Sequence, residues 1–212
     1  MQSNIGSWKP LKLHLKDRQN TGVKVYAQVF SSSGPTLNWV FRVEDSCKEL
    51  AENFVHEEIW KNSSKIFRGK DLWRENCFEV FLKPTTDCED YFEWNFMAPH
   101  FWDFYAFTDF RINSDSAKKN FLTKNLASNF SCYKNSSDNY ELAGQIFVSQ
   151  ISLLSWSLNT LQTEAAINLS CILQTRDKTQ LHFALNHPSG DKPDFHNKAG
   201  FIPLEKAVST VR

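Results

Sequence analysis

The sequence predicts an all-β fold, namely an antiparallel β-sandwich or jelly roll with few short helices. Aromatic residues make up 14% of the 212 residues, including 18 Phe and 7 Trp, and aromatic side chains favour the half-buried surfaces of strands. Apolar and polar residues alternate with a period of two in several segments, which is typical of strands with one buried face. Segments rich in turn residues separate these runs. A length of 212 residues suits one sandwich domain over residues 1–212, and a hydrophobic share of 41% is enough for its core.

The first two strands are predicted at residues 23–29 and 37–43. Small apolar residues occupy every second position of the first segment, and large apolar residues do so in the second. Residues 31–35 read Ser-Ser-Ser-Gly-Pro, so the pair is predicted to form an antiparallel hairpin. In residues 45–65 the apolar side chains are spaced irregularly among charges. This spacing predicts a long loop or short helical turns, where binding residues often lie.

The rest of the chain predicts seven further strands. Three of them follow one another closely and indicate a β-meander, at residues 77–82, 91–96 and 102–110. The remaining four are expected at residues 130–133, 141–148, 167–174 and 181–185. Short helices are predicted at residues 121–126 and 151–158. About nine strands with few helices are typical of a sandwich or jelly roll.

Charge and cysteine content narrow the classes of partner. Lys plus Arg equals Asp plus Glu at 24 each, whereas nucleic-acid-binding proteins usually carry a basic excess, so no nucleic acid is expected. No apolar run is long enough for a signal peptide or a membrane span. The five Cys residues show no C-x-x-C spacing and no disulfide framework. We therefore expect a cytoplasmic protein that does not bind membranes, and the sequence predicts no oligomeric state.

Trp73 and Glu79 are the first candidate site residues. Trp73 directly precedes a predicted strand, where its ring can stack on the apolar face of a sugar. Glu79 lies within that strand among large apolar residues, and a carboxylate in such surroundings needs a partner. The simpler structural interpretation is that Trp73 covers the core and that Glu79 pairs with Arg74 or Arg111.

Glu93 repeats the pattern of Glu79 on the next strand. It lies on the face opposite to Phe92 and Trp94, since side chains alternate along a strand. If the two strands pair, the two carboxyl groups are near neighbours. They could then act as the acid/base pair of a glycosidase, bind a cation, or bind hydroxyl groups. Catalysis is the least favoured of these three interpretations.

The C-terminal segment holds the other candidate residues, His187, Asp194 and His196. Histidine and carboxylate side chains are metal ligands, so a metal site here is one interpretation. The spacing matches no recognised metal motif, and hydrogen bonding within a loop is the simpler interpretation. The sequence also contains no P-loop, no G-x-S-x-G and no H-E-x-x-H motif.

Three blocks of this sequence resemble bacterial DOMON-like proteins, which are related to the family 9 carbohydrate-binding modules. The first block is residues 72–84, Leu-Trp-Arg-Glu-Asn-Cys-Phe-Glu-Val-Phe-Leu-Lys-Pro. The second is residues 91–96 together with Pro99, Trp102, Tyr105, Phe107 and Arg111. The third comprises His187-Pro188, residues 193–196 and Gly200-Phe201. The blocks span most of the chain, but residues 112–162 hold no matching motif.

The resemblance implies a jelly-roll β-sandwich that binds a ligand. In family 9 modules two Trp rings hold a sugar unit, and Trp73 and Glu79 are similar to the first Trp and the acidic residue of that site. The second Trp has no counterpart, because residues 186–188 read Asn-His-Pro. Other DOMON domains bind haem through Met and His, and Met97 is the only Met in the middle of this chain. Family 9 modules are also known with bound calcium, so the resemblance allows a structural calcium.

Taken together, these observations predict a binding module for a saccharide or another small, polar, hydroxyl-rich molecule. The alternatives are a glycoside hydrolase with paired carboxylates, a haem-binding electron carrier, and a protein–protein interaction domain. An enzyme is the less favoured interpretation. The predicted ligand-binding residues are Trp73, Glu79, Glu93, Arg111, His187, Asp194 and His196.

Overall fold

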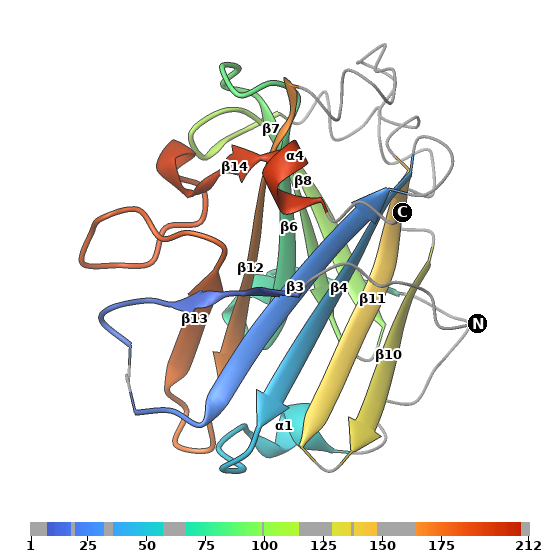
Figure 1. Ribbon diagram of the computed structural model, residues 1–212, viewed down its shortest axis with the longest axis vertical. Coiled ribbons are helices and arrows are strands. Elements are labelled where there is room, and N and C mark those ends of the chain that lie inside the picture. Colours follow the sequence, from blue (N-terminus) through green and yellow to red (C-terminus); the bar gives the residue numbers. More distant parts are fainter. Residues whose placement is uncertain are drawn as a thin grey trace.

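Two β-sheets pack face to face and form a sandwich (Figure 1). This arrangement is seen in a computed structural model, which describes residues 8–17, 20–31, 36–56, 67–98, 100–114, 129–136, 138–147 and 164–208. Nearly all neighbouring strands run antiparallel; the exception among the named strands is the parallel pair β5 and β8. The predicted antiparallel β-sandwich with few short helices is therefore confirmed.

The smaller sheet has five strands in the order β1-β3-β4-β11-β10. Its central hairpin pairs β3 with β4 in register from Val23 opposite Asp45 to Ser31 opposite Leu37, as the alternation in these segments predicted. The five strands are β1 (Lys9–Pro10), β3 (Val23–Ser31), β4 (Thr36–Asp45), β10 (Asn129–Ser136) and β11 (Asn139–Phe147).

The larger sheet has nine strands, and its main path is β2-β13-β12-β6-β7-β8-β5. Two short strands lie off this path, since β14 pairs with β12 and β9 pairs with β8. The predicted meander is β6-β7-β8 at its centre. The strands are β2 (Lys12–Leu13), β5 (Phe67–Arg68), β6 (Cys77–Lys83), β7 (Tyr91–Met97), β8 (Phe101–Asp109), β9 (Ile112–Asn113), β12 (Ala166–Gln174), β13 (Gln180–Ala184) and β14 (Ile202–Pro203).

Helical structure within the described residues consists of single turns. Each of the nine predicted strands overlaps a described strand of five or more residues. The two-residue strands were not predicted, because two residues are too few to show an alternation of apolar and polar side chains. The predicted helices at residues 121–126 and 151–158 lie outside the described residues. None of the described helices has the length and apolar character needed to cross a membrane. The turns are α1 (Glu52–Val55), η2 (Leu72–Arg74), η4 (Lys198–Gly200) and α4 (Leu204–Ala207).

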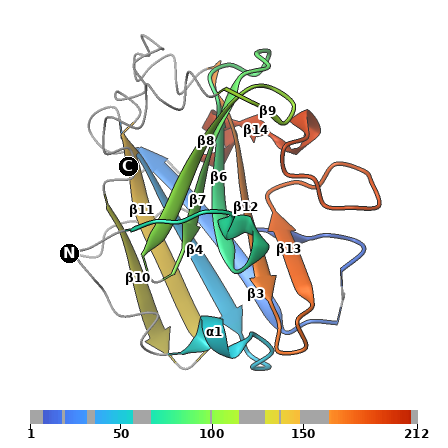
Figure 2. The same ribbon diagram turned by 180° about the vertical axis from the view of Figure 1, so that it is seen from behind.

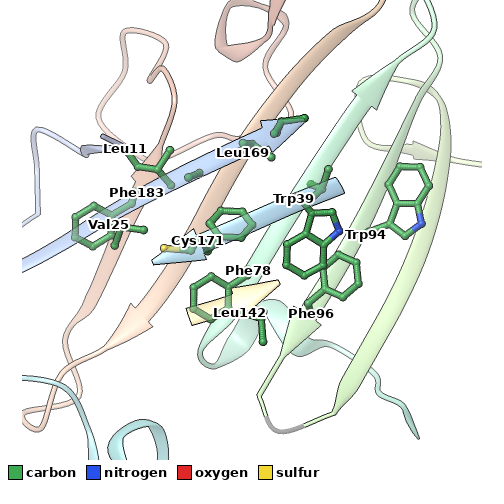
Figure 3. Close-up of a cluster of buried hydrophobic side chains, with 14 of the residues drawn as sticks. Leu11, Val25, Trp39, Phe78, Trp94, Phe96, Leu142, Leu169, Cys171 and Phe183 are labelled. Atoms are coloured by element: carbon green, nitrogen blue, oxygen red, sulfur yellow. The ribbon is translucent and has the colours of Figure 1, made fainter. Parts of the chain in front are cut away.

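The main core lies between the two sheets and is rich in aromatic side chains (Figure 3). Trp39 of the smaller sheet meets Phe96 of the larger one with ring centroids 4.3 Å apart, and Phe41 meets Phe78 at 5.2 Å. All four side chains are buried. Removing each such side chain from water contributes about 2–3 kcal/mol, so the aromatic excess of the sequence serves mainly to hold the sheets together.

The other face of the larger sheet carries a second set of buried side chains. Side chains alternate along β6, so Phe78 and Val80 enter the main core while Glu79 and Phe81 face away from it. Figure 2 shows this sheet from behind, with the segment that contains η2 crossing in front of it. This outer face also holds a small apolar cluster of Phe81, Tyr91, Phe107, Ile172, Ala184 and Phe195.

Candidate ligand-binding site

A pocket of about 620 Å³ opens on the outer face of the larger sheet. Its volume is within the usual range for small-molecule sites. The floor comes from five neighbouring strands of the sheet and its β8–β9 hairpin, and the walls come from the η2 turn and from the loop between β13 and β14. The lining residues are Trp73, Arg74, Glu79, Glu93, Tyr105, Phe107, Arg111, Asn113, Ile172, Gln180, His182, Pro193, Phe195 and His196.

Glu79 and Glu93 lie next to each other on the floor of this pocket. Strands β6 and β7 pair so that Glu79 is opposite Asn95, and Phe81 is opposite Glu93. The two glutamates are therefore diagonal neighbours on one face, a relation that brings Cβ atoms within about 8 Å. Their exposed fractions are only 3% and 4%. The pairing of strands thus brings two buried carboxyl groups together at the ligand-accessible face.

Burial changes the ionisation of both carboxyl groups. Loss of solvation raises the pKa of Glu79 from 4.5 to about 7, while the Ser170 hydroxyl and the charge of Arg111 act in the opposite direction. The Ser170 hydroxyl donates a hydrogen bond of 2.9 Å to Glu79 Oε2. Burial raises the pKa of Glu93 well above 4.5, and the negative charge of Glu79 adds to this effect. At neutral pH the pair therefore retains a proton and offers both a donor and an acceptor.

His196 forms one side of the pocket beside Glu93. Its Nδ1 is hydrogen-bonded to the Tyr91 hydroxyl at 2.8 Å, and its Nε2 lies 3.8 Å from Glu93 Oε2. Burial, assisted by the charge of Arg111, lowers the pKa of His196 to about 4, so the ring is neutral at pH 7. The Tyr91 oxygen also accepts the backbone N–H of Arg111 at 3.1 Å.

Arg111 brings a positive charge to the pocket from the turn between β8 and β9. Its guanidinium donates to Asp194 Oδ1 at 3.0 Å, which links this turn to the C-terminal loop. The backbone of Arg111 has a φ of 57°, a left-handed conformation that costs a residue with a Cβ about 1–2 kcal/mol. Such strain is held by the surrounding contacts, here the Tyr91 hydroxyl and Asp194.

Trp73 stands at the rim of the pocket with an exposed ring. Its exposed fraction is 45%, which is high for a large aromatic side chain. The guanidinium of Arg74 lies 4.8 Å from the centre of the ring, and the Gln180 side chain donates to the backbone carbonyl of Arg74 at 3.2 Å. The η2 turn is thus tied to strand β13. Trp73 does not cover the core, so the simpler interpretation of this residue does not hold.

The structure brings together most of the residues predicted for the site. Five of the seven line the pocket, namely Trp73, Glu79, Glu93, Arg111 and His196. Asp194 lies behind Arg111 as its ion-pair partner.

His187 is not among the lining residues. Its Nε2 is hydrogen-bonded to the backbone carbonyl of Lys12 at 2.8 Å, and its ring meets that of His14 edge to face. It fixes the start of the C-terminal loop to strand β2, and this contact is its role in the structure.

The sequence analysis did not select the other nine pocket residues, among them Tyr105 and His182. Tyr105 is directly opposite Glu93 in the β7–β8 register, so the alternation along the meander could have revealed it. His182 donates its backbone N–H to Asp17 at 2.6 Å. It reaches the pocket only because β13 lies beside β12, a neighbour relation that the order of the strands in the sequence does not contain.

The part of the chain that the structure describes shows no cluster of side chains that fits a resident metal ion. Among the described residues, no group of three or more His, Cys, Asp or Glu side chains is placed to hold a metal. Met97 is not part of the pocket, and lines a separate cavity with Phe101 and Asn76.

Comparisons with known proteins support the fold. No family model matches this chain, and a search of curated proteins found no matching sequence. A solved structure from Bacteroides uniformis ATCC 8492, described as a "putative carbohydrate-binding protein", is similar with a TM-score of 0.57. The two chains are 12% identical, and the similarity covers 93% of this chain and 85% of the other. At this identity the likeness shows a shared β-sandwich fold, and it does not show membership of the DOMON-like proteins or the family 9 modules.

Proposed function

We propose that this protein binds a saccharide, or a similar hydroxyl-rich small molecule, in the pocket on the outer face of the larger sheet. The observation that carries the proposal is the combination of two buried carboxyl groups on the pocket floor with an exposed tryptophan ring at its rim. Sugars present both hydroxyl groups and apolar C–H faces, and this pocket offers partners for each.

Each part of the pocket has a role in this proposal. Trp73 stacks against the apolar face of a sugar ring. Glu79 and Glu93 accept hydrogen bonds from sugar hydroxyls, and the proton that they retain at neutral pH allows one of them to donate as well. Arg111 donates from the side of the β8–β9 turn. The resemblance of residues 72–84 to family 9 modules, and the description of the Bacteroides protein, agree with this assignment.

Isothermal titration against a panel of neutral mono- and disaccharides tests the proposal. We expect at least one sugar to bind the wild-type protein, and Trp73→Ala to weaken that binding about tenfold through loss of the stacking surface. Trp73→Phe is expected to retain most of the affinity, because it keeps an aromatic face.

Phe67→Ala is the matched control, since Phe67 is 52% exposed yet does not line the pocket. This variant is expected to bind like the wild type. If no sugar in the panel releases heat, or if Trp73→Ala binds as well as Phe67→Ala, the proposal is wrong.

Glycoside hydrolysis is the second candidate function, and the adjacency of Glu79 and Glu93 favours it. Glycosidases use two carboxyl groups that act as acid and as base or nucleophile. In this pocket burial raises the pKa of both groups, which suits a proton donor better than a nucleophile. A panel of aryl glycosides tests this alternative, because hydrolysis releases an aryl alcohol that can be measured. Release by the wild type and its loss in Glu79→Gln would establish hydrolysis and not binding alone.

A further inference from the structure

A second hollow lies beside the pocket, on the surface formed by the β8–β9 turn and the C-terminal loop. Its volume is about 550 Å³, close to that of the pocket itself. It is lined by Phe110 and Arg111 from the turn, and by residues 188–190, 192–194 and 197 from the loop. Arg111 and Asp194 were predicted as site residues, whereas Phe110 and Lys192 belong to none of the motifs described above.

The hollow and the pocket adjoin each other, because Arg111 and Pro193 line both of them. The ion pair between Arg111 and Asp194 stands at this boundary, with Asp194 on the side of the hollow. The Arg111 side chain is 55% exposed even though it forms this ion pair. A ligand that extends out of the pocket on the side of Arg111 therefore lies next to the hollow.

The lining of the hollow repeats the chemistry of the pocket rim. Phe110 is 45% exposed, at a turn position where a polar residue is usual. The carboxylate of Asp109 accepts the backbone N–H of Phe110 at 2.6 Å, which fixes the turn that presents the ring. Pro193 adds apolar surface, and the exposed Lys192 adds a hydrogen-bond donor. An aromatic ring with polar groups around it is a surface on which a sugar unit can stack.

We propose that this hollow is a second subsite, which binds the neighbouring sugar unit of an oligosaccharide whose first unit occupies the pocket. The inference rests on the proposed function and deepens it, because it assigns the ligand to chains of two or more units. Phe110 supplies the stacking surface of the second subsite, as Trp73 does for the first. Arg111 lies between the two units and can donate to either.

Titration with sugar series of increasing length tests this subsite. The probes are glucose with its β-1,4- and α-1,4-linked chains of two to four units, and N-acetylglucosamine with its β-1,4-linked chains of the same lengths. In the series that binds, we expect the affinity to rise about fivefold or more from one unit to two. In Phe110→Ala the ratio between the affinities for two units and one unit is expected to fall to about one, because the stacking surface is lost.

Ile112→Ala is the matched control, since Ile112 is 56% exposed, follows Phe110 by two residues and lines neither cavity. It is expected to keep both the affinity and its rise with chain length. Equal affinity for all lengths, or a rise that survives in Phe110→Ala, would overturn the second subsite while leaving saccharide binding intact. Failure of every sugar to bind would overturn both proposals.

Discussion

Replacing Glu79 by Gln is expected to stabilise the folded protein at pH 8 by about 3 kcal/mol and to weaken saccharide binding by tenfold or more. The first effect follows from burial, which raises the pKa of this carboxyl group from 4.5 to about 7. The second follows from the position of Glu79 on the pocket floor. The amide oxygen of the substitute can still accept the Ser170 hydrogen bond, so the local geometry is kept.

The stabilisation is expected to depend on pH with a definite sign. Below about pH 4.5 the carboxyl group is protonated in the folded and in the unfolded chain, so it affects both states equally. Between pH 4.5 and about 7 the unfolded chain releases the proton while the folded chain holds it. The wild type therefore loses stability as the pH rises through this window, and the loss is complete above it. The difference between Glu79→Gln and wild type should be small at pH 4.5 and largest at pH 8.

Urea unfolding at pH 4.5, 6, 7 and 8 measures this difference. Burial lowers the pKa of His196 to about 4, so this residue makes the folded protein more stable as the pH rises. Comparison with wild type at each pH removes this contribution, because it is present in both proteins. Glu75→Gln is the matched control, because Glu75 is exposed on the turn that precedes β6. Its difference from wild type is expected to stay near zero at all four pH values. A Glu79→Gln variant that is less stable than wild type at pH 8 would contradict the assignment of Glu79 as a buried, unfavourable charge.

Such a result would explain why a charged residue lies within an apolar strand. The strand β6 would be more stable with an apolar or amide side chain at this position, since burying a carboxylate costs free energy. A residue that destabilises the fold while facing a pocket is best understood as a binding group. The same reasoning applies to Glu93, whose pKa is raised by burial and by the charge of Glu79.

The alternation of side chains made the fold and the pocket floor predictable from the sequence. In β6 and β7 the large apolar residues occupy one face, so Glu79 and Glu93 had to lie on the other. Their neighbour relation followed once the two strands paired as a hairpin, which is the usual arrangement for successive strands joined by a short loop. The exposed position of Trp73 could not be predicted from this alternation, because it depends on the η2 turn that crosses the outer face of the sheet.

The walls of the pocket could not be predicted in the same way. His187 and His196 belong to one loop, yet the first contacts Lys12 and the second enters the pocket. A loop has no repeating period, so its side-chain directions are set by contacts with distant parts of the chain. The position of His182 in the pocket depends on the placement of β13 beside β12 and two strands away from β6. His182 and Glu79 are about 100 residues apart in the sequence.

Arg111 provides the second prediction, because its backbone strain and its side chain can be separated by substitution. Arg111→Ala and Arg111→Gly both remove a guanidinium that lines the pocket and whose charge acts on Glu79 and Glu93, so both are expected to weaken saccharide binding about tenfold or more. Only Gly adopts the φ of 57° at this position without strain. The Gly variant should therefore be more stable than the Ala variant by about 1 kcal/mol, as measured by urea unfolding.

Lys178 is the matched control for this comparison, since it has a φ of 65° in the turn between β12 and β13 and does not line the pocket. Lys178→Gly should exceed Lys178→Ala in stability by a similar amount, and both should bind saccharide like the wild type. If binding is unchanged in both Arg111 variants, Arg111 acts only as a link between the turn and Asp194. If binding is lost in both while the stability difference matches that at Lys178, the strained turn holds a guanidinium whose role is to contact the ligand. The left-handed backbone at Arg111 would then lower the stability of the folded protein while placing a guanidinium in the binding site.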